Sequence, residues 1–250
     1  MPNSLDGRVA LIIGGSGGIG AATARLFAGA GARIVITHTI RSVVSAAALA
    51  ESLPGAGHLA IPADVADTAS LLALRDAVRG RCGEVLHVLV NAAGFTKPVP
   101  HADLDALDDA LIDRMFAVNW RGQFAAIRTF APMLKASGDG LIVSISSIAG
   151  QTGTGSSIAY CAAKAGIDVM TKSLGRALAP EVRVIGIAPG VVDTNFVPGR
   201  GEDFNTKIAA ATPLRRIATP TDVAEAVLAY ATSLRFSTGT TMVVDGGRSL

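Results

Sequence analysis

Short apolar runs alternate with helical patterns along the chain, and this alternation limits the fold more than any other feature. Strand-like runs stand at 8–13, 33–38, 58–62, 85–91, 140–146, 182–188 and 240–244. Helical patterns stand at 18–30, 42–53, 68–81, 104–116, 120–136, 157–179 and 221–234. The runs 85–90 and 141–145 are almost wholly apolar, as strands covered on both faces are. The pattern predicts an α/β fold, a Rossmann-like doubly wound parallel sheet of seven strands with helices on both faces.

Length and composition predict one domain that covers residues 1–250. Half of the 250 residues are hydrophobic and only 17% are charged, against a usual ~25%, so the chain can bury a large core and subunit interfaces. No Pro/Ser-rich linker, low-complexity tract or internal repeat divides the sequence.

Charge and hydropathy argue against nucleic acid and membranes as partners. The net charge is +2 without a basic cluster. The start, Met1 to Asp6, lacks the pattern of a signal peptide, and no apolar stretch approaches the ~18 residues of a membrane span. We therefore expect a soluble, cytoplasmic protein. Cys82 and Cys161 are far apart in sequence and are expected to be small buried hydrophobes, with no disulfide and no metal site.

A glycine-rich turn follows the first apolar run. Residues 14–20 hold five glycines in seven positions, and a helical pattern starts within them. Glycine lets a phosphate approach the backbone, and the free N–H groups at a helix start favour an anion. Strand, tight turn and helix in this order predict a dinucleotide site.

Tyr160 and Lys164 are four residues apart on a predicted helix, so their side chains leave nearly the same face. A nearby cation favours the ionised phenol, whose pKa is ordinarily ~10. Lowering that pKa by two to three units requires roughly 3–4 kcal/mol, and one cation at ~4 Å supplies about 4 kcal/mol at an effective dielectric of ~20. The pair can therefore serve as a proton donor and acceptor near neutral pH. A solvated lysine on an ordinary amphipathic helix is the plain alternative.

Several motifs in order make the chain similar to the short-chain dehydrogenase/reductase family over nearly its whole length. They are the glycine turn from Gly14 to Gly20, Asp64 before Val65, Asn91-Ala92-Ala93-Gly94, the set Asn119, Ser147, Tyr160 and Lys164, the Pro189-Gly190 pair, and Asp245-Gly246-Gly247 near the end. The resemblance implies that Asn119, Ser147, Tyr160 and Lys164 are catalytic. It implies a nicotinamide dinucleotide site formed by Gly14, Ser16, Gly17, Gly18, Ile19, Gly20, Asp64, Val65, Asn91, Ala92, Ala93, Gly94, Tyr160, Lys164, Pro189, Gly190, Val192 and Thr194.

Two positions depart from the family pattern. Ile13 replaces a threonine before the first glycine, and Ala92 replaces an asparagine. Losing both polar partners together can be nearly neutral inside a core. We expect the two changes to compensate for one another.

The resemblance implies reversible hydride transfer between a nicotinamide and a ketone or secondary alcohol. Tyr160 would exchange the proton, Ser147 would hold the developing oxyanion, and Lys164 would bias the phenol and bind the nicotinamide ribose. Asn119 would fix a water that links Lys164 to solvent. Two alternatives stay open at this point: Ser146 in place of Ser147, and Asn119 as a helix cap.

The end of the second strand bears on cofactor choice. An acidic residue there would bind the ribose 2′-hydroxyl of NAD, but this chain has His38, with Thr39 and Arg41 after it. A hydroxyl and a positive charge favour the 2′-phosphate, so we expect NADP, with NAD as the other choice. Gly17 argues the other way, because many NADP-dependent relatives carry a basic residue there.

The substrate is the least constrained part of the prediction. Residues 151–155 and a lid at about 195–212 are expected to wall the pocket. The resemblance points to 3-oxoacyl carrier-protein reductases, hence a 3-oxoacyl thioester or small ketone, with a secondary alcohol or sugar polyol as the alternative. A non-catalytic dinucleotide-binding regulator and an epimerase are alternatives of other classes. Family members commonly form tetramers through the helices at 120–136 and 157–179, so a homotetramer, or a dimer, is expected.

Overall fold

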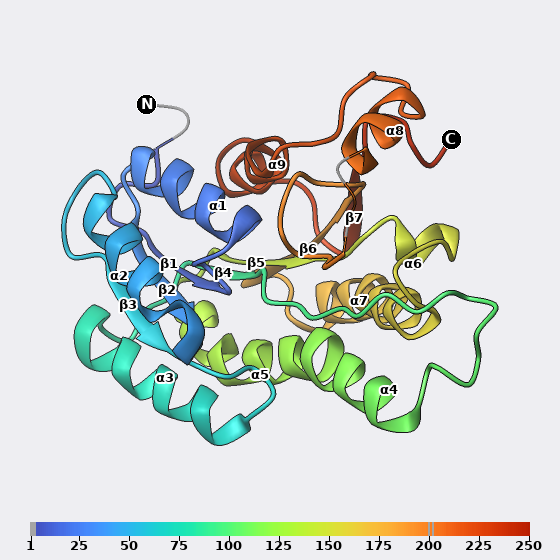
Figure 1. Cartoon of the computed structure of the whole chain (residues 1–250). Helices are drawn as coiled ribbons and strands as arrows, with labels where there is room; N and C mark the ends of the chain where they lie inside the picture. The colour runs from blue at the N-terminus through green and yellow to red at the C-terminus, as the bar shows by residue number, and fades with distance from the viewer. Residues whose placement is uncertain (1–3, 200, 202) are drawn as a thin grey trace.

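A single parallel sheet runs through the molecule (Figure 1). The computed structural model describes residues 4–199, 201 and 203–250. The strand order is β3 (Leu59–Pro62), β2 (Arg33–His38), β1 (Val9–Ile13), β4 (Val88–Asn91), β5 (Gly140–Ile145), β6 (Val182–Pro189) and β7 (Thr240–Val244). All neighbouring pairs are parallel. The predicted doubly wound, seven-stranded fold is confirmed.

Helices cover both faces of this sheet, and each layer encloses its own core. One face carries α1 (Gly18–Gly29), α2 (Val43–Ser52) and α9 (Pro220–Thr232), packed over Ala10 and Ile12. The other carries α3 (Thr68–Cys82), α5 (Gly122–Lys135) and α7 (Ile158–Ala177), packed over Leu11 and Ile13. Side chains alternate between faces along each strand, and both faces are apolar because both are covered.

Two predicted elements start later than expected. The helix predicted at 104–116 is α4 (Asp109–Phe116), because the carboxylate of Asp108 accepts a hydrogen bond from the Leu111 N–H at 2.7 Å and caps the helix there. The strand predicted at 85–91 starts at Val88 as β4. Upstream of it, the Leu86 N–H donates to the Met133 carbonyl of α5 instead of to a strand.

The helix predicted at 120–136 starts differently as well. A π-helical turn, η2 (Ala117–Arg121), joins α4 to α5 without a break in the chain direction. Three short elements were not predicted: η1 (Ile40–Ser42), α6 (Ala149–Thr152) and α8 (Phe204–Ala210). The lid predicted at 195–212 therefore contains a helix, and its residues 200 and 202 lie outside the described residues.

The compensation expected between Ile13 and Ala92 has no side-chain contact to support it, although the Ala92 N–H donates a hydrogen bond to the Ile13 carbonyl at 2.9 Å. Ile13 packs in the core beneath α3, α5 and α7, whereas Ala92 packs against the core on the opposite face of the sheet. The two side chains therefore do not replace a shared polar pair.

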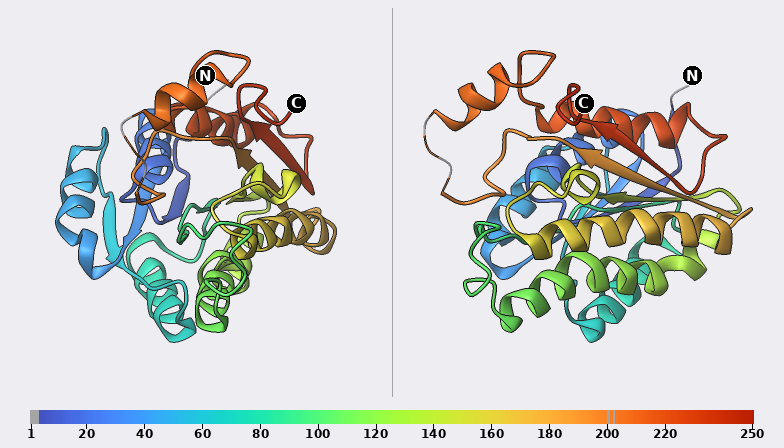
Figure 2. Two further views of the ribbon diagram at one scale, coloured as in Figure 1. Left: turned by 45° about the vertical axis from the view of Figure 1, so that its right-hand side comes forward. Right: turned by 90° about the vertical axis from the view of Figure 1, so that its right-hand side faces the viewer.

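The chain order reverses between β1 and β4, and a doubly wound sheet opens a crevice at that point, beyond the carboxyl ends of the strands. The turn after β1 packs tightly against the segment after β4. A Cβ at Gly14 would lie 2.6 Å from the Ala93 nitrogen, and φ at Gly14 is +77°, so only glycine fits. Figure 2 (right) shows α8 and the loop between β4 and α4 at the same end of the molecule. The crevice thus lies among these segments.

Candidate active site

A cavity of about 1670 Å³ lies at the carboxyl ends of the strands. Its lining contains most of the predicted site residues: Gly14, Ser16, Gly17, Gly18, Ile19, His38, Thr39, Arg41, Asp64, Val65, Ala92, Ala93, Gly94, Ser147, Tyr160, Lys164, Pro189, Gly190, Val192 and Thr194. Gly20, Asn91 and Asn119 are outside the lining. The cavity is large enough for a dinucleotide together with a small substrate.

The glycine turn fits a pyrophosphate. Gly17 is the N-cap of α1, it makes no side-chain cap, and the first turn of α1 has no acidic residue. A Cβ at Gly17 would meet nothing, so the space above the turn is open. The first N–H groups of α1 therefore have no side-chain partner and no nearby carboxylate, and such groups can bind an anion.

The segment after β2 forms the adjoining wall. His38 is buried and its Nδ1 lies 3.1 Å from the Thr39 carbonyl. The hydroxyl of Ser16 donates to that of Ser42 at 3.2 Å, which ties η1 to the glycine turn. Ser42 lines the cavity and was not predicted. No carboxylate from β2 or η1 lines this part of the cavity among the described residues.

Asp64, which follows β3, and Asn91, the last residue of β4, lie in different surroundings. The carboxylate of Asp64 accepts a hydrogen bond from the Ala66 N–H at 2.8 Å. Asn91 is buried under the cavity wall, and its amide donates to the Ser144 hydroxyl at 3.4 Å. Asp64 therefore faces the cavity, whereas Asn91 belongs to the sheet beneath it.

Tyr160 and Lys164 lie in the first two turns of α7. The helix starts there because the Ser157 hydroxyl accepts a hydrogen bond from the Tyr160 N–H at 3.2 Å. Lys164 Nζ donates to the Ile145 carbonyl at 2.7 Å and lies 5.6 Å from the centre of the Tyr160 ring. Lys164 is only 3% exposed, so the solvated-lysine alternative is wrong.

Burial lowers the pKa of Lys164 from its usual value to about 8, and the Asp168 carboxylate one turn later opposes that decrease. At pH 7 the ammonium form of Lys164 therefore predominates, and it is lost as the pH rises through about 8. Few lysines titrate so close to neutrality, and such values are typical of functional sites.

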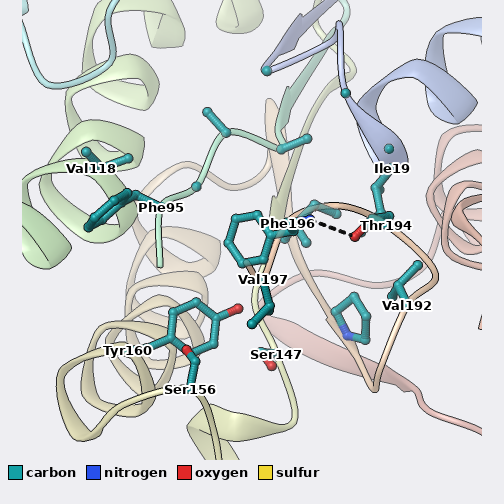
Figure 3. A pocket seen from close by; sticks show the side chains of 18 of the residues that line it. Ile19, Phe95, Val118, Ser147, Ser156, Tyr160, Val192, Thr194, Phe196 and Val197 are labelled. Atoms are coloured by element: carbon teal, nitrogen blue, oxygen red, sulfur yellow. Dashed lines mark hydrogen bonds between the residues drawn. The ribbon is translucent and has the colours of Figure 1, made fainter. Parts of the chain in front are cut away.

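The structure separates the two adjacent serines. Ser146 is buried and its hydroxyl donates to the Lys164 carbonyl at 3.1 Å, which attaches α7 to the end of β5. Ser147 lines the cavity, and its hydroxyl accepts a hydrogen bond from the Ala149 N–H at 3.1 Å. Figure 3 shows the Tyr160 hydroxyl pointing into the pocket on the side where Ser147 lies. Ser146 also contributes to the lining, but it is only 2% exposed and its hydroxyl is engaged, whereas Ser147 is half-buried.

Asn119 is not a helix cap, so that alternative is wrong. It lies inside η2, fully buried. Its Oδ1 accepts a hydrogen bond from the Phe95 N–H at 3.0 Å, and its Nδ2 donates to the carbonyls of Phe95 and Met115 at 2.8 and 2.9 Å. Asn119 therefore fixes the segment that follows β4.

Aromatic and basic side chains close the other end of the cavity; Phe196, Phe204 and Ile208 belong to the predicted lid, whereas Phe95 and Arg114 were not predicted. Phe196 packs against Tyr160, with 6.1 Å between the ring centres, and its N–H donates to the Thr194 hydroxyl at 3.4 Å (Figure 3). Phe95, Arg114, Phe204 and Ile208 also line the cavity. Of the predicted wall at 151–155, Thr152, Thr154 and Gly155 line it, while Gln151 and Gly153 do not. Only tertiary contacts bring these segments together.

The described residues offer neither a metal site nor a membrane span. No group of three or more His, Cys, Asp or Glu side chains is placed to hold a metal ion. No helix within the described ranges is long and apolar enough to cross a membrane. Cys161 is buried and Cys82 half-buried, and burial raises the pKa of both thiols.

Fold and site together define an oxidoreductase that uses a nicotinamide dinucleotide, and comparison with known proteins agrees. A family model described as enoyl-(acyl carrier protein) reductase matches residues 14–249. The chain belongs to the short-chain dehydrogenase/reductase family. It is therefore an enzyme that acts on CH–OH donors or the corresponding carbonyl compounds with NAD(P).

Individual relatives cover the whole chain. A protein of Streptomyces violaceoruber, named as a ketoacyl reductase of the granaticin polyketide synthase, is 39% identical and covers 97% of this chain and 96% of its own. The cis-4-hydroxycyclohexanecarboxylate dehydrogenase of Sinomonas cyclohexanicum is 38% identical, covering 96% of each. A crystal structure from Burkholderia xenovorans, named as a short-chain dehydrogenase/reductase, superposes with a TM-score of 0.91 at 34% identity, covering 98% of each chain.

Proposed function

We propose that this enzyme reduces a ketone to a secondary alcohol with NADPH, and that the reaction is reversible. The observation that carries the proposal is the buried ammonium of Lys164, 5.6 Å from the Tyr160 ring, at the end of the cavity that Ser147 also lines. When bound, the reduced nicotinamide supplies a hydride to the carbonyl carbon.

The chain's own residues act on the carbonyl oxygen. Tyr160 donates its phenolic proton to that oxygen as negative charge develops there, and Ser147 donates a hydrogen bond to it. Lys164 stabilises the phenolate that remains, because an ammonium within a low-dielectric wall interacts strongly with an anion. In the oxidation of an alcohol the same proton returns to Tyr160.

Asn119 acts in this proposal mainly as a support. Both N–H bonds of its side-chain amide are used by backbone carbonyls, so a water that links Lys164 to solvent would bind to an oxygen of Asn119, either the second lone pair of Oδ1 or the backbone carbonyl. Asn119 also holds Phe95, and hence the wall opposite the lid. The expected lid is residues 195–212, from which Phe196 and Phe204 line the cavity.

The expected cofactor is NADP. Arg41, Thr39 and Ser42 line the cavity where the ribose 2′-substituent would lie, and they supply a charge and two hydroxyls. The ratio of kcat/KM for NADPH to kcat/KM for NADH should fall at least tenfold in Arg41→Ala. An unchanged ratio would exclude Arg41 from the 2′-phosphate site.

The expected substrate is a 3-oxoacyl thioester or another ketone. The Streptomyces relative named as a ketoacyl reductase favours the thioester, and the Sinomonas relative favours the alternative, dehydrogenation of a secondary alcohol. A panel of ketones, thioesters and sugar alcohols, followed by absorbance at 340 nm with both cofactors, tests the proposal. Product formation without net NADPH consumption would indicate an epimerase, and binding without turnover a regulator. A cytoplasmic homotetramer with residues 1–250 as one domain completes the proposal.

A further inference from the structure

Arg114 forms part of the cavity wall and makes no ion pair with the described part of the chain. It lies in the last turn of α4, and its guanidinium carbon is 4.2 Å from the centre of the Phe95 ring. Both side chains line the cavity. A guanidinium over an aromatic face is attracted to the ring, while its N–H groups can still donate to a ligand. No carboxylate among the described residues lies within ion-pair distance of Arg114.

The platform under Arg114 is rigid. Asn119 accepts a hydrogen bond from the Phe95 N–H and donates one to the Phe95 carbonyl, so the backbone that carries the ring is held at both polar groups. The helix that carries Arg114 is anchored on the other side by Leu111 and Met115, which are buried. A charge held in a fixed position binds its partner with a smaller loss of conformational entropy than a free side chain does.

The position of Phe95 assigns Arg114 to the substrate end of the cavity. Phe95 and Tyr160 pack against the same small core, formed by Val99, Leu111, Met115, Ala159 and Ala163. Figure 3 shows Phe95 and Tyr160 on the side of the pocket opposite Ile19 and Thr194. The glycine turn and Arg41 belong to that other side. Arg114 is therefore not one of the groups that would hold the cofactor phosphates.

The charges of the lining are unbalanced. The charged side chains are Arg41, Arg114, Lys164 and Arg248 against Asp64 and Asp193. Asp64 is engaged by the Ala66 N–H and Asp193 by the Asn205 amide. We propose that Arg114 binds an anionic substituent of the substrate, a carboxylate or a phosphate, at a distance from the carbonyl that is reduced. This inference rests on the proposed ketone reduction and adds that the enzyme prefers ketones that carry a negative charge.

The two sources of the anion are separated by matched substrate pairs. For the carboxylate, the pairs are acetoacetate with methyl acetoacetate, and 4-oxocyclohexanecarboxylate with its methyl ester. For the phosphate, the pair is S-acetoacetyl-4′-phosphopantetheine with S-acetoacetyl-pantetheine. Each pair keeps the ketone and changes only the charge. The quantity compared is kcat/KM of the anionic member divided by kcat/KM of the neutral member.

We expect the wild-type ratio to exceed ten in the carboxylate or the phosphate pairs, because a charge-assisted pair with a guanidinium discriminates by about tenfold or more. Arg114→Gln should bring that ratio close to one, because kcat/KM of the anionic member falls much more than kcat/KM of the neutral member. Arg114→Lys, which keeps the charge without the planar fork, should retain part of the preference. Arg25→Gln removes the same charge from the exposed side of α1 and should leave the ratio unchanged. Equal melting temperatures show that the variants are folded.

Three outcomes overturn the inference. In the first, the wild-type ratio is one or below in every pair. In the second, Arg114→Gln leaves the ratio as in the wild type. In the third, Arg248→Gln abolishes the preference and Arg114→Gln does not. In each of these the neutral ketones are still reduced, so the proposed function stands. If no member of any pair is reduced, the proposed function fails and the inference fails with it.

Discussion

At the scale of single residues, two neighbouring side chains of the same type have different roles, one structural and one proposed to be chemical. Ser146 and Ser147 have the same side chain and both line the cavity, but the Ser146 hydroxyl is buried and donates to the backbone of α7, whereas Ser147 is only half-buried. Sequence alone could not choose between them without the spacing of a known family, because the choice depends on which face of the β5 end each hydroxyl meets. In the structure, the two serines are distinguished by their burial, because Ser146 is buried and Ser147 is half-buried.

Replacing each serine by alanine should give opposite results. Ser147→Ala should lower kcat for ketone reduction by about 10²- to 10³-fold with an unchanged melting temperature, since it removes one donor to the developing oxyanion. Ser146→Ala should lower the free energy of unfolding by about 1 kcal/mol and affect kcat far less, because it leaves the Lys164 carbonyl without that donor. Steady-state kinetics and urea denaturation of both variants check this, and a larger loss of kcat in Ser146→Ala would reverse the assignment.

The pH dependence of reduction should follow Lys164. Burial lowers the pKa of this ammonium to about 8, so its charge is present below that pH and is lost as the pH rises through it. Reduction needs the charge, and kcat/KM should therefore fall as the pH rises above about 8. A lysine in solvent would give the same fall only near pH ~10.4. A profile that stays level up to pH 10 would contradict a charged, buried Lys164 as the group that stabilises the phenolate.

At the scale of elements, the strands and most helices follow from the sequence because each buries a regular apolar face. The runs that became β1, β5 and β6 are continuous because both faces of the sheet are covered. The η2 turn and α8 were not predictable in this way. A π-helical turn depends on what Asn119 binds at its centre, and α8 buries no residue fully, so its sequence carries little periodic pattern.

Two buried side-chain amides, Asn119 in η2 and Gln123 in α5, should differ in how their replacement by leucine changes the free energy of unfolding. Asn119→Leu removes three hydrogen bonds to Phe95 and Met115, and should lower the free energy of unfolding by about 2–3 kcal/mol because buried backbone groups lose their partners. Gln123 is also buried, but neither polar atom of its side chain has a partner among the described residues. Gln123→Leu should therefore be neutral or stabilising. Urea denaturation of both variants provides the comparison, and equal losses would show that the hydrogen bonds of Asn119 are not what matters.

At the scale of the whole molecule, the fold places segments from the entire chain around one cavity, and this explains what sequence could and could not predict. Glycine turns, strand ends and the Tyr160–Lys164 spacing are local patterns and were predicted. The contact of Arg114 with the Phe95 ring and the tilted packing of Phe196 beside Tyr160 join distant segments, and no local sequence pattern predicts such contacts.

The proposed tetramer can be tested on α7. Val169 is 63% exposed in the single chain, in the middle of a helix expected at a subunit interface. Val169→Glu should convert a particle of four 25.3 kDa chains into smaller species in light scattering after gel filtration, because a buried carboxylate without a partner is costly. Val44→Glu, at an exposed position of α2, is the matched control and should not change the mass. An unchanged mass in Val169→Glu would remove α7 from the interface.

The central claim is that Tyr160 exchanges the proton at the carbonyl oxygen, and the rate of NADPH oxidation by Tyr160→Phe tests it most directly. With a ketone that the wild type reduces, kcat should fall by about 10²- to 10⁴-fold, which is the usual contribution of a general acid. The dissociation constant for NADPH, measured by fluorescence, should stay within a few-fold of the wild type, because the phenol is one of many groups that line the cavity. Reduction at the wild-type rate by Tyr160→Phe would contradict the account.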